Sequence, residues 1–220
     1  MILSHGVSDD VKRDQPNQGG RGQARTRLAR RAVVAAARTL FLESGYAATT
    51  IEAISNLADV PPATIYRLFA SKLGILKALL DTSIAGDDQA FTVQERPNVA
   101  SLSTEPDPIK LLVGFAGVTT AINQRTNDVY RVLVGAAASD PAAAELLNEI
   151  QQQRNRGQSQ IARALDRNRS LREGVQEHDA VDLIHALMSP EVYRLLVVDR
   201  NWPPERYQQW LATTLIQQLT

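Results

Sequence analysis

Residues 49–72 read TTIEAISNLADVPPATIYRLFASK, and this stretch decides the fold of the first third of the chain. Ile51 and Ile54 lie on one face of a short predicted helix. That helix ends near Ala58, because two consecutive prolines follow within four residues and proline does not continue a helix. The chain is therefore expected to turn sharply after Ala58.

A second short helix is predicted from Pro62 to Phe69, because proline suits the first position of a helix. Ile65 and Phe69 are spaced to share its buried face. Ser71 is a suitable N-cap for a further helix that begins at Lys72 and carries several leucines. Two short helices joined by a tight turn and held between longer ones are typical of a helix-turn-helix.

The preceding segment predicts a longer helix from Arg25 that ends at Gly45, with apolar side chains at Val33, Ala37, Leu40 and Phe41. Thr49 and Glu52 have the spacing of a capping box at the start of the next helix. Residues 1–23 contain proline and several glycines and few large apolar side chains, so we expect a disordered arm there.

The composition is that of an ordinary globular protein, with 44% hydrophobic and 22% charged residues. There is no cysteine, which excludes a disulfide framework, a thiolate zinc site and a cysteine nucleophile. The polar N-terminal stretch lacks the apolar segment of a signal peptide, and no other segment is long and apolar enough to span a bilayer. We therefore expect a cytoplasmic protein.

The charges are unevenly distributed although the formal net charge is zero. Residues 1–80 contain 11 basic and 6 acidic side chains, and residues 81–220 contain 13 and 18. A basic N-terminal part on an acidic body favours a nucleic-acid partner for the N-terminal part.

The rest of the chain predicts further helices and no strand. Much of the stretch 92–108 is expected to be loop, and one helix begins at Ile109 while a separate buried one covers Val129–Ala138. Later helices begin at Pro141, before Val181 and near Pro204; Ser189 and Pro190 either kink the helix there or restart it. The predicted fold is all-α with about nine helices, divided into an arm (1–23), a helix-turn-helix domain (24–82) and a C-terminal domain (83–220).

The stretch from Arg31 to Lys77 resembles the N-terminal domain of the tetracycline-repressor (TetR) family, and its most diagnostic piece is TIYRLFASK at residues 64–72. The similarity covers about a quarter of the chain. It departs from the family at Asp59, where the family usually has glycine in the turn. Aspartate tolerates the left-handed conformation that such a turn requires.

The resemblance implies DNA contacts residue by residue. It places Thr50 on a backbone phosphate, Tyr66 and Lys72 on further phosphates, and Pro62, Ala63, Thr64 and Arg67 against bases or sugars. Arg67 has the side chain that can bind guanine in a bidentate manner. Independently of the family, Arg25 and Arg27 belong to an arginine cluster that would attract the neighbouring DNA backbone or minor groove.

The segment 189–211 resembles the closing helices of one branch of the family, in which the last two helices form the dimer interface with their copies. For this interface we expect Tyr207, Trp210, Leu211 and Leu215, which give the final helix a wide apolar surface. Their alternative interpretation is the core of one subunit. A homodimer would read a pseudo-palindromic site.

An effector pocket is expected among the C-terminal helices. Its candidate residues, chosen by type and helix position, are Phe115, Thr119, Asn123, Tyr130, His185, Met188 and Tyr193. Each of them is also compatible with plain core packing.

We predict a DNA-binding regulator, a repressor released from its operator by a small molecule, and not an enzyme. No cofactor or metal is expected: His5, His178 and His185 are scattered, and no third acid follows Asp87 and Asp88. Nucleotide-binding, metalloprotease and nucleophile-elbow motifs are absent from the sequence. The alternatives are an activator on the same scaffold, a helical ligand carrier or enzyme without a DNA role, and a protein-interaction module.

Overall fold

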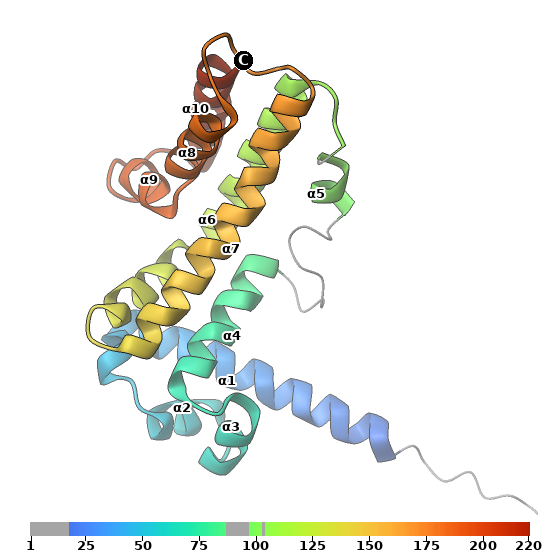
Figure 1. Ribbon diagram of the computed structural model, residues 1–220. Helices are drawn as coiled ribbons and strands as arrows, with labels where there is room; N and C mark the ends of the chain where they lie inside the picture. The colour runs from blue at the N-terminus through green and yellow to red at the C-terminus, as the bar shows by residue number, and fades with distance from the viewer. Residues whose placement is uncertain (1–17, 87–96, 103) are drawn as a thin grey trace, which may run out of the picture.

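The computed structural model describes residues 18–86, 97–102 and 104–220, and over these residues all regular secondary structure is helical (Figure 1). The arm at residues 1–17, His5, and the acidic pair Asp87 and Asp88 lie outside the described residues. The helices are α1 (Gln18–Ala48), α2 (Ile51–Ala58), α3 (Pro62–Phe69), α4 (Lys72–Ala85), α5 (Pro97–Leu102), α6 (Pro108–Ala137), α7 (Pro141–Arg167), α8 (Glu177–Leu187), α9 (Pro190–Tyr193) and α10 (Pro204–Leu219). A π-helical turn, Arg194–Val198, continues α9.

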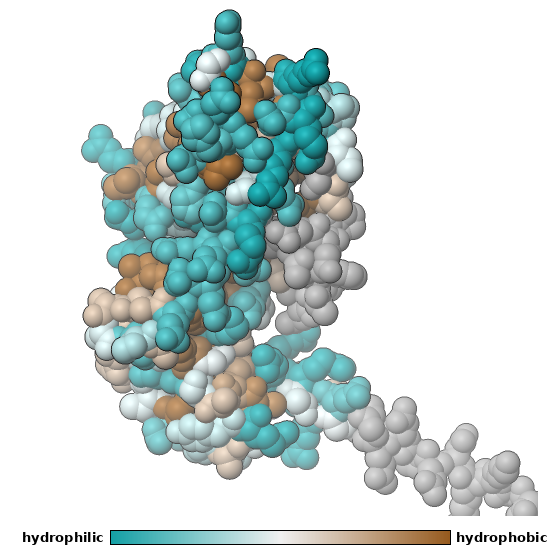
Figure 2. Space-filling model, in the orientation of Figure 1, coloured by the Kyte–Doolittle hydropathy of each residue, from teal (hydrophilic) through white to brown (hydrophobic). Residues whose placement is uncertain are grey.

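Helices α1 to α4 gather at one end of the molecule, and the long pair α6 and α7 rises from them to the other end (Figure 1). There α8, α9 and α10 pack beside the upper part of α6 and α7. In the view of Figure 2 the outer face over α7 is largely hydrophilic. None of the helices that the structure describes has the length and apolar character needed to cross a bilayer.

Several predicted helix limits are confirmed. Helix α3 has the predicted bounds, α2 ends at Ala58, α4 begins at Lys72, and Gly45 leaves helical geometry with φ 78° and ψ 167°. The hydroxyl of Ser71 accepts the backbone N–H of Gly74 at 3.0 Å, which is the predicted N-cap.

The predicted N-cap of α2, Thr49, is wrong by one residue. Thr50 is the N-cap of α2, and its hydroxyl accepts the N–H of Ala53 at 3.1 Å. Thr49 is buried instead, and its hydroxyl donates to the carbonyl oxygen of Gly45 at 2.8 Å. The first threonine therefore closes the end of α1, which leaves the second to begin α2.

The start of α1 and the middle of the chain also differ from prediction. Helix α1 begins at Gln18, so residues 18–23 belong to it and not to the arm, since the glycines there weaken a helix without forbidding it. A short helix, α5, occupies part of the predicted loop 92–108. The two helices predicted around Ile109 and Val129 form one helix, α6, because no proline or glycine interrupts the polar stretch 121–128 between them.

Three polar side chains of that stretch of α6 are buried, and two of them have hydrogen-bond partners within the chain. Asn123, Thr126 and Asn127 are each no more than 6% exposed. The Thr126 hydroxyl donates to the carbonyl of Ile122 at 2.9 Å, and Asn127 Nδ2 donates to the carbonyl of Pro190 at 2.9 Å. These internal partners allow a polar segment to lie inside a helical body.

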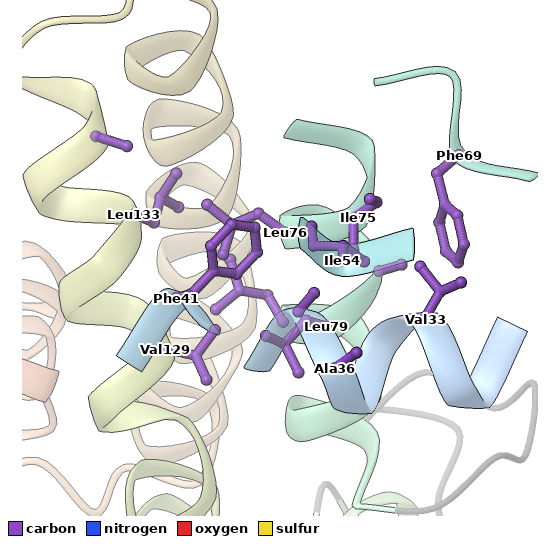
Figure 3. Close-up of a cluster of buried hydrophobic side chains, with 14 of the residues drawn as sticks. Val33, Ala36, Phe41, Ile54, Phe69, Ile75, Leu76, Leu79, Val129 and Leu133 are labelled. Carbon is purple, nitrogen blue, oxygen red and sulfur yellow. The ribbon is translucent and has the colours of Figure 1, made fainter. Parts of the chain in front are cut away.

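One apolar core joins the N-terminal helices to the body. Phe41 of α1 packs against Val129 and Leu133 of α6, and Ile54 and Leu76 continue the same cluster into α2 and α4 (Figure 3). A second core holds α6, α7, α8 and α10 together at the opposite end. The N-terminal helices are therefore anchored on the body through shared side chains and not through a linker alone.

Gly74, in the first turn of α4, permits a close approach between α3 and α4. A Cβ atom at this position would lie 1.9 Å from the carbonyl oxygen of Phe69. We predict that Gly74→Ala lowers the free energy of unfolding by about 1–3 kcal/mol, the usual cost of overpacking. Urea denaturation followed by circular dichroism measures this change.

Gly135→Ala in α6 is the matched control, because a Cβ at that position meets nothing within 4 Å. There the better helix propensity of alanine is expected to raise stability by up to about 1 kcal/mol. Equal effects of the two substitutions would show that the contact at Gly74 does not constrain α3.

Candidate nucleic-acid interface

The turn between α2 and α3 is fixed by reciprocal hydrogen bonds between Ser55 and Val60. The buried Ser55 hydroxyl donates to the carbonyl of Val60 at 2.7 Å, and the N–H of Val60 donates to the carbonyl of Ser55 at 3.2 Å. Asp59 between them has φ 51° and ψ 43°, the left-handed conformation expected for the position where the family usually has glycine. The angle between the two helices is thus set by the turn itself.

Helix α3 presents one face to solvent and buries the other. Ile65 is 1% exposed and Phe69 is 7% exposed, and both belong to the N-terminal core. On the opposite face Tyr66 is 51% exposed, and Arg67 is exposed beside it. An exposed phenol can donate to a phosphate oxygen, and a guanidinium can bind a base edge or a phosphate.

The remaining predicted residues of α3 lie at its start. Pro62 and Ala63 are exposed and Thr64 is half-buried. Pro62 occupies the first helical position, where its missing N–H costs no hydrogen bond. The structure therefore brings Pro62, Ala63, Tyr66 and Arg67 together on one open surface.

Arg30 of α1 holds the end of α3. Its Nη1 donates to the carbonyl of Leu68 at 3.2 Å, and its guanidinium lies 4.7 Å from the centre of the Phe69 ring. A cation at a helix C-terminus complements the exposed carbonyls and the helix dipole. The sequence alone does not predict this role for Arg30, because only the three-dimensional fold brings α1 beside α3.

Lys72 is placed differently from the prediction of a phosphate contact. Its Nζ donates to the carbonyl oxygens of Tyr46 and Thr49 at 2.7 and 2.8 Å and lies 4.3 Å from the centre of the Tyr46 ring. Burial lowers the pKa of Lys72, while the charge of Asp140 acts in the opposite direction. The ammonium therefore ties α4 to the segment joining α1 and α2.

The other predicted DNA contacts are at the rim of this surface. Thr50 is exposed at the start of α2, and its hydroxyl serves as the N-cap described above. Arg25 and Arg27 are exposed in the first half of α1, a helix whose N-terminal part extends beyond the other helices (Figure 1). The contacts of all these residues with DNA remain predictions.

Comparison with known proteins agrees with this geometry. The family model for bacterial regulatory proteins of the tetR family matches residues 33–79, which include α2, α3 and the first half of α4. Over these residues the chain is similar to the N-terminal domain of TetR-family regulators. The match begins within α1 and covers the whole helix-turn-helix.

Two relatives are helix-turn-helix regulators. YdeS of Bacillus subtilis strain 168, named an uncharacterized HTH-type transcriptional regulator, is 26% identical over 182 residues, covering 82% of this chain and 84% of YdeS. TcmR of Streptomyces glaucescens, an HTH-type transcriptional regulator, is 33% identical over 116 residues, covering 53% of this chain and 46% of TcmR. The prediction of a DNA-binding transcriptional regulator is thereby confirmed.

The fold is also similar to that of solved structures. NalD of Pseudomonas aeruginosa, the secondary repressor of the MexAB-OprM multidrug efflux pump, superposes with a TM-score of 0.66 at 18% identity, covering 90% of this chain and 98% of NalD. At this identity the likeness concerns the fold alone. The prediction of an all-helical chain with an N-terminal helix-turn-helix and a helical C-terminal part is confirmed.

The body contains a cavity of about 210 Å³ between α4, α6 and α7. Five of the seven predicted pocket residues line it: Phe115, Thr119, Asn123, Tyr130 and Met188. His185 does not line the cavity but bonds to Arg154 and Gln158, which do. Tyr193 is buried in the second core against Tyr207, with ring centres 5.0 Å apart, and is therefore not a pocket residue.

The predicted dimer residues are largely wrong. Tyr207, Leu211 and Leu215 are fully buried within one subunit, where α10 packs on α6 and α8. Trp210 is half-buried and makes an edge contact with Trp202. The apolar face of α10 is wide because it covers two helices of its own chain.

We predict that Lys72 matters more for stability than for phosphate binding. Lys72→Met removes charged hydrogen bonds to partly buried carbonyls, so the free energy of unfolding should fall by about 1.5–3 kcal/mol. Lys77→Met is the matched control: Lys77 pairs with Glu149 at 3.5 Å on the surface, and such pairs contribute at most about 1 kcal/mol. Chemical denaturation gives both values.

A role of Lys72 in phosphate binding would give a different experimental result. If Lys72 mainly contacts phosphate, Lys72→Met would leave stability unchanged and reduce the slope of log affinity against log salt by about one.

Proposed function

We propose that this chain is a repressor that inserts α3 into the major groove of operator DNA and is released by a small molecule bound in its cavity. The observation that carries the proposal is the exposed face of α3, with Tyr66 and Arg67 held outward by a buried opposite face. In this proposal Tyr66 and Thr50 position the protein on phosphates, and Arg67 reads a base pair.

A homodimer is part of the proposal. One subunit presents a single recognition helix, and two copies related by a two-fold axis would read the two halves of a pseudo-palindrome. The half-buried apolar residues of α8 and α10 that pack at the edge of the second core, Leu183, Leu187, Trp210 and Ile216, are the proposed seam. They replace the fully buried residues expected from the sequence.

The route from the cavity to α3 is short. Leu80 and Ile84 of α4 line the cavity, and the same helix carries Lys72 and Gly74 at its other end. Arg125 of α6 donates to the carbonyls of Ser83 and Ile84 at 3.1 and 3.2 Å, which joins the end of α4 to α6. A ligand with different affinities for two positions of α4 would change operator affinity by the same coupling free energy.

In this proposal residues 24–82 act as the DNA-binding unit and residues 83–220 bind the effector and form the dimer. The protein would act in the cytoplasm, where operator DNA is accessible. The direction of regulation follows from a promoter–reporter assay: deletion of the gene should raise transcription from the bound promoter. A fall on deletion would identify an activator.

We predict that Arg67→Ala reduces the affinity for an operator obtained by in vitro selection from random DNA. The loss of one bidentate base contact costs about 1–3 kcal/mol, or roughly five- to 150-fold. Fluorescence anisotropy measures the affinity, and light scattering on the same samples reports whether the protein is dimeric.

Arg156→Ala is the matched control, because Arg156 is an exposed arginine on α7 away from the helix-turn-helix. The affinity of the Arg156→Ala variant for the selected operator should equal that of the unaltered protein. Selection of no preferred sequence, or equal losses in both variants, would contradict base reading by Arg67.

A further inference from the structure

The cavity between α4, α6 and α7 has apolar walls and a single charge. Apolar side chains from all three helices form most of the lining, including Ile84, Phe115 and Ile150. Among the described lining residues Arg154 is the one charged side chain, and none is acidic. A positive charge in an apolar cavity costs solvation free energy unless something else requires it.

The guanidinium of Arg154 is oriented by a chain of hydrogen bonds from α7 and α8. Its Nη2 donates to Nε2 of His185 at 2.9 Å, and Nδ1 of His185 donates to Oε1 of Gln158 at 3.1 Å. This arrangement requires a neutral imidazole, because only an unprotonated Nε2 can accept a hydrogen bond from the guanidinium. Burial, followed by the charge of Arg154, lowers the pKa of His185, which keeps the ring neutral.

Arg154 retains unused donor capacity. Its Nη1 is buried and has no hydrogen-bond partner. Asn123 Nδ2, on the facing wall of the cavity, is also buried, but the Tyr207 hydroxyl lies beside it as an acceptor. Buried donors of native proteins are nearly always paired, so the unpaired Nη1 of Arg154 at this cavity indicates a missing acceptor.

No carboxylate of the described residues neutralises Arg154. The charge of Glu191 acts on Arg154, but Glu191 is exposed, accepts a hydrogen bond from the Tyr130 hydroxyl at 3.3 Å and forms no ion pair with the guanidinium. An exposed carboxylate that is hydrated compensates a buried cation only weakly. The cavity therefore has a charge preference that the protein itself leaves unsatisfied.

We propose that the ligand of this cavity is a small monocarboxylate with an apolar body, bound with its carboxylate on Arg154 and its body among the aliphatic and aromatic walls. This inference rests on the proposed function in identifying the ligand as the effector. A cavity of about 210 Å³ equals the volume of about seven liquid water molecules, which suits a ligand of octanoate size. The fixed guanidinium supplies a fork of two donors for the carboxylate.

Isothermal titration calorimetry of the full chain with octanoate, octanamide and octylammonium tests the proposal, since the three probes share a chain length and differ in charge. Octanoate is expected to bind at least tenfold more tightly than octanamide, and octylammonium to show no binding. Cinnamate, a rigid aromatic carboxylate, is expected to bind with the same preference over cinnamamide.

Three variants test whether the preference for octanoate over octanamide comes from Arg154. Arg154→Met should abolish the difference between octanoate and octanamide, and Arg154→Lys should retain part of it because the charge remains. Arg156→Met, an exposed position two residues further along α7, should behave like the unaltered protein. Equal binding of octanoate and octanamide, tighter binding of octylammonium, an unchanged preference in Arg154→Met, or binding of neither carboxylate would overturn the proposal.

Operator release, measured by anisotropy with the same compounds, separates this inference from the proposed function. In one outcome octanoate binds in a way that depends on Arg154 and yet leaves the DNA bound. This result would support the charge preference of the cavity and contradict release of the operator by this ligand. Release by a neutral compound with no preference for carboxylates supports an effector-controlled regulator and contradicts the assignment to Arg154.

Discussion

The burial of Ile65 and Phe69 beneath α3 is the contact on which the DNA-binding surface depends. With these two side chains in the N-terminal core, Tyr66 and Arg67 can only point outward. Arg30 fixes the end of α3, and Lys72 and Gly74 fix the helix that follows it. An eight-residue helix is too short to be stable alone, so its orientation comes entirely from these neighbours.

The same core packs the N-terminal helices directly against the body. Phe41 contacts Val129 and Leu133 of α6, and the ion pair between Arg38 and Asp128 crosses the same boundary. Helix α4 contributes to this core with Leu76 and to the cavity with Ile84. One continuous helix therefore connects the cavity lining to the base of α3.

The sequence predicts the helix-turn-helix well because its limits are local. Two prolines end α2 and begin α3, and a capping serine begins α4, so no distant residue is needed to place these bounds. The surface against which an apolar helix face packs cannot be predicted in this local way. Periodicity identifies the apolar face of α10 but not whether that face covers its own chain or a second copy, and Tyr207 proves to lie fully buried in its own subunit.

Buried polar residues explain the other failures. The polar stretch 121–128 looks like a break between helices, yet Asn127 bonds to the Pro190 carbonyl inside the body, and α6 continues through it. Arg154 carries no sequence signal, since an arginine on a polar helix usually faces solvent. Its position beside His185 depends on the packing of α7 against α8, which no local pattern reveals.

Because the chain contains no cysteine, a single Ala63→Cys variant can carry an iron chelate that cleaves DNA near the start of α3. On the selected operator, cleavage should cluster in each half-site at positions facing the major groove, while the same chelate on Arg156→Cys in α7 should give only background. Cleavage from Ala63→Cys no stronger than from Arg156→Cys, with the operator fully bound, would mean that α3 does not lie on the DNA.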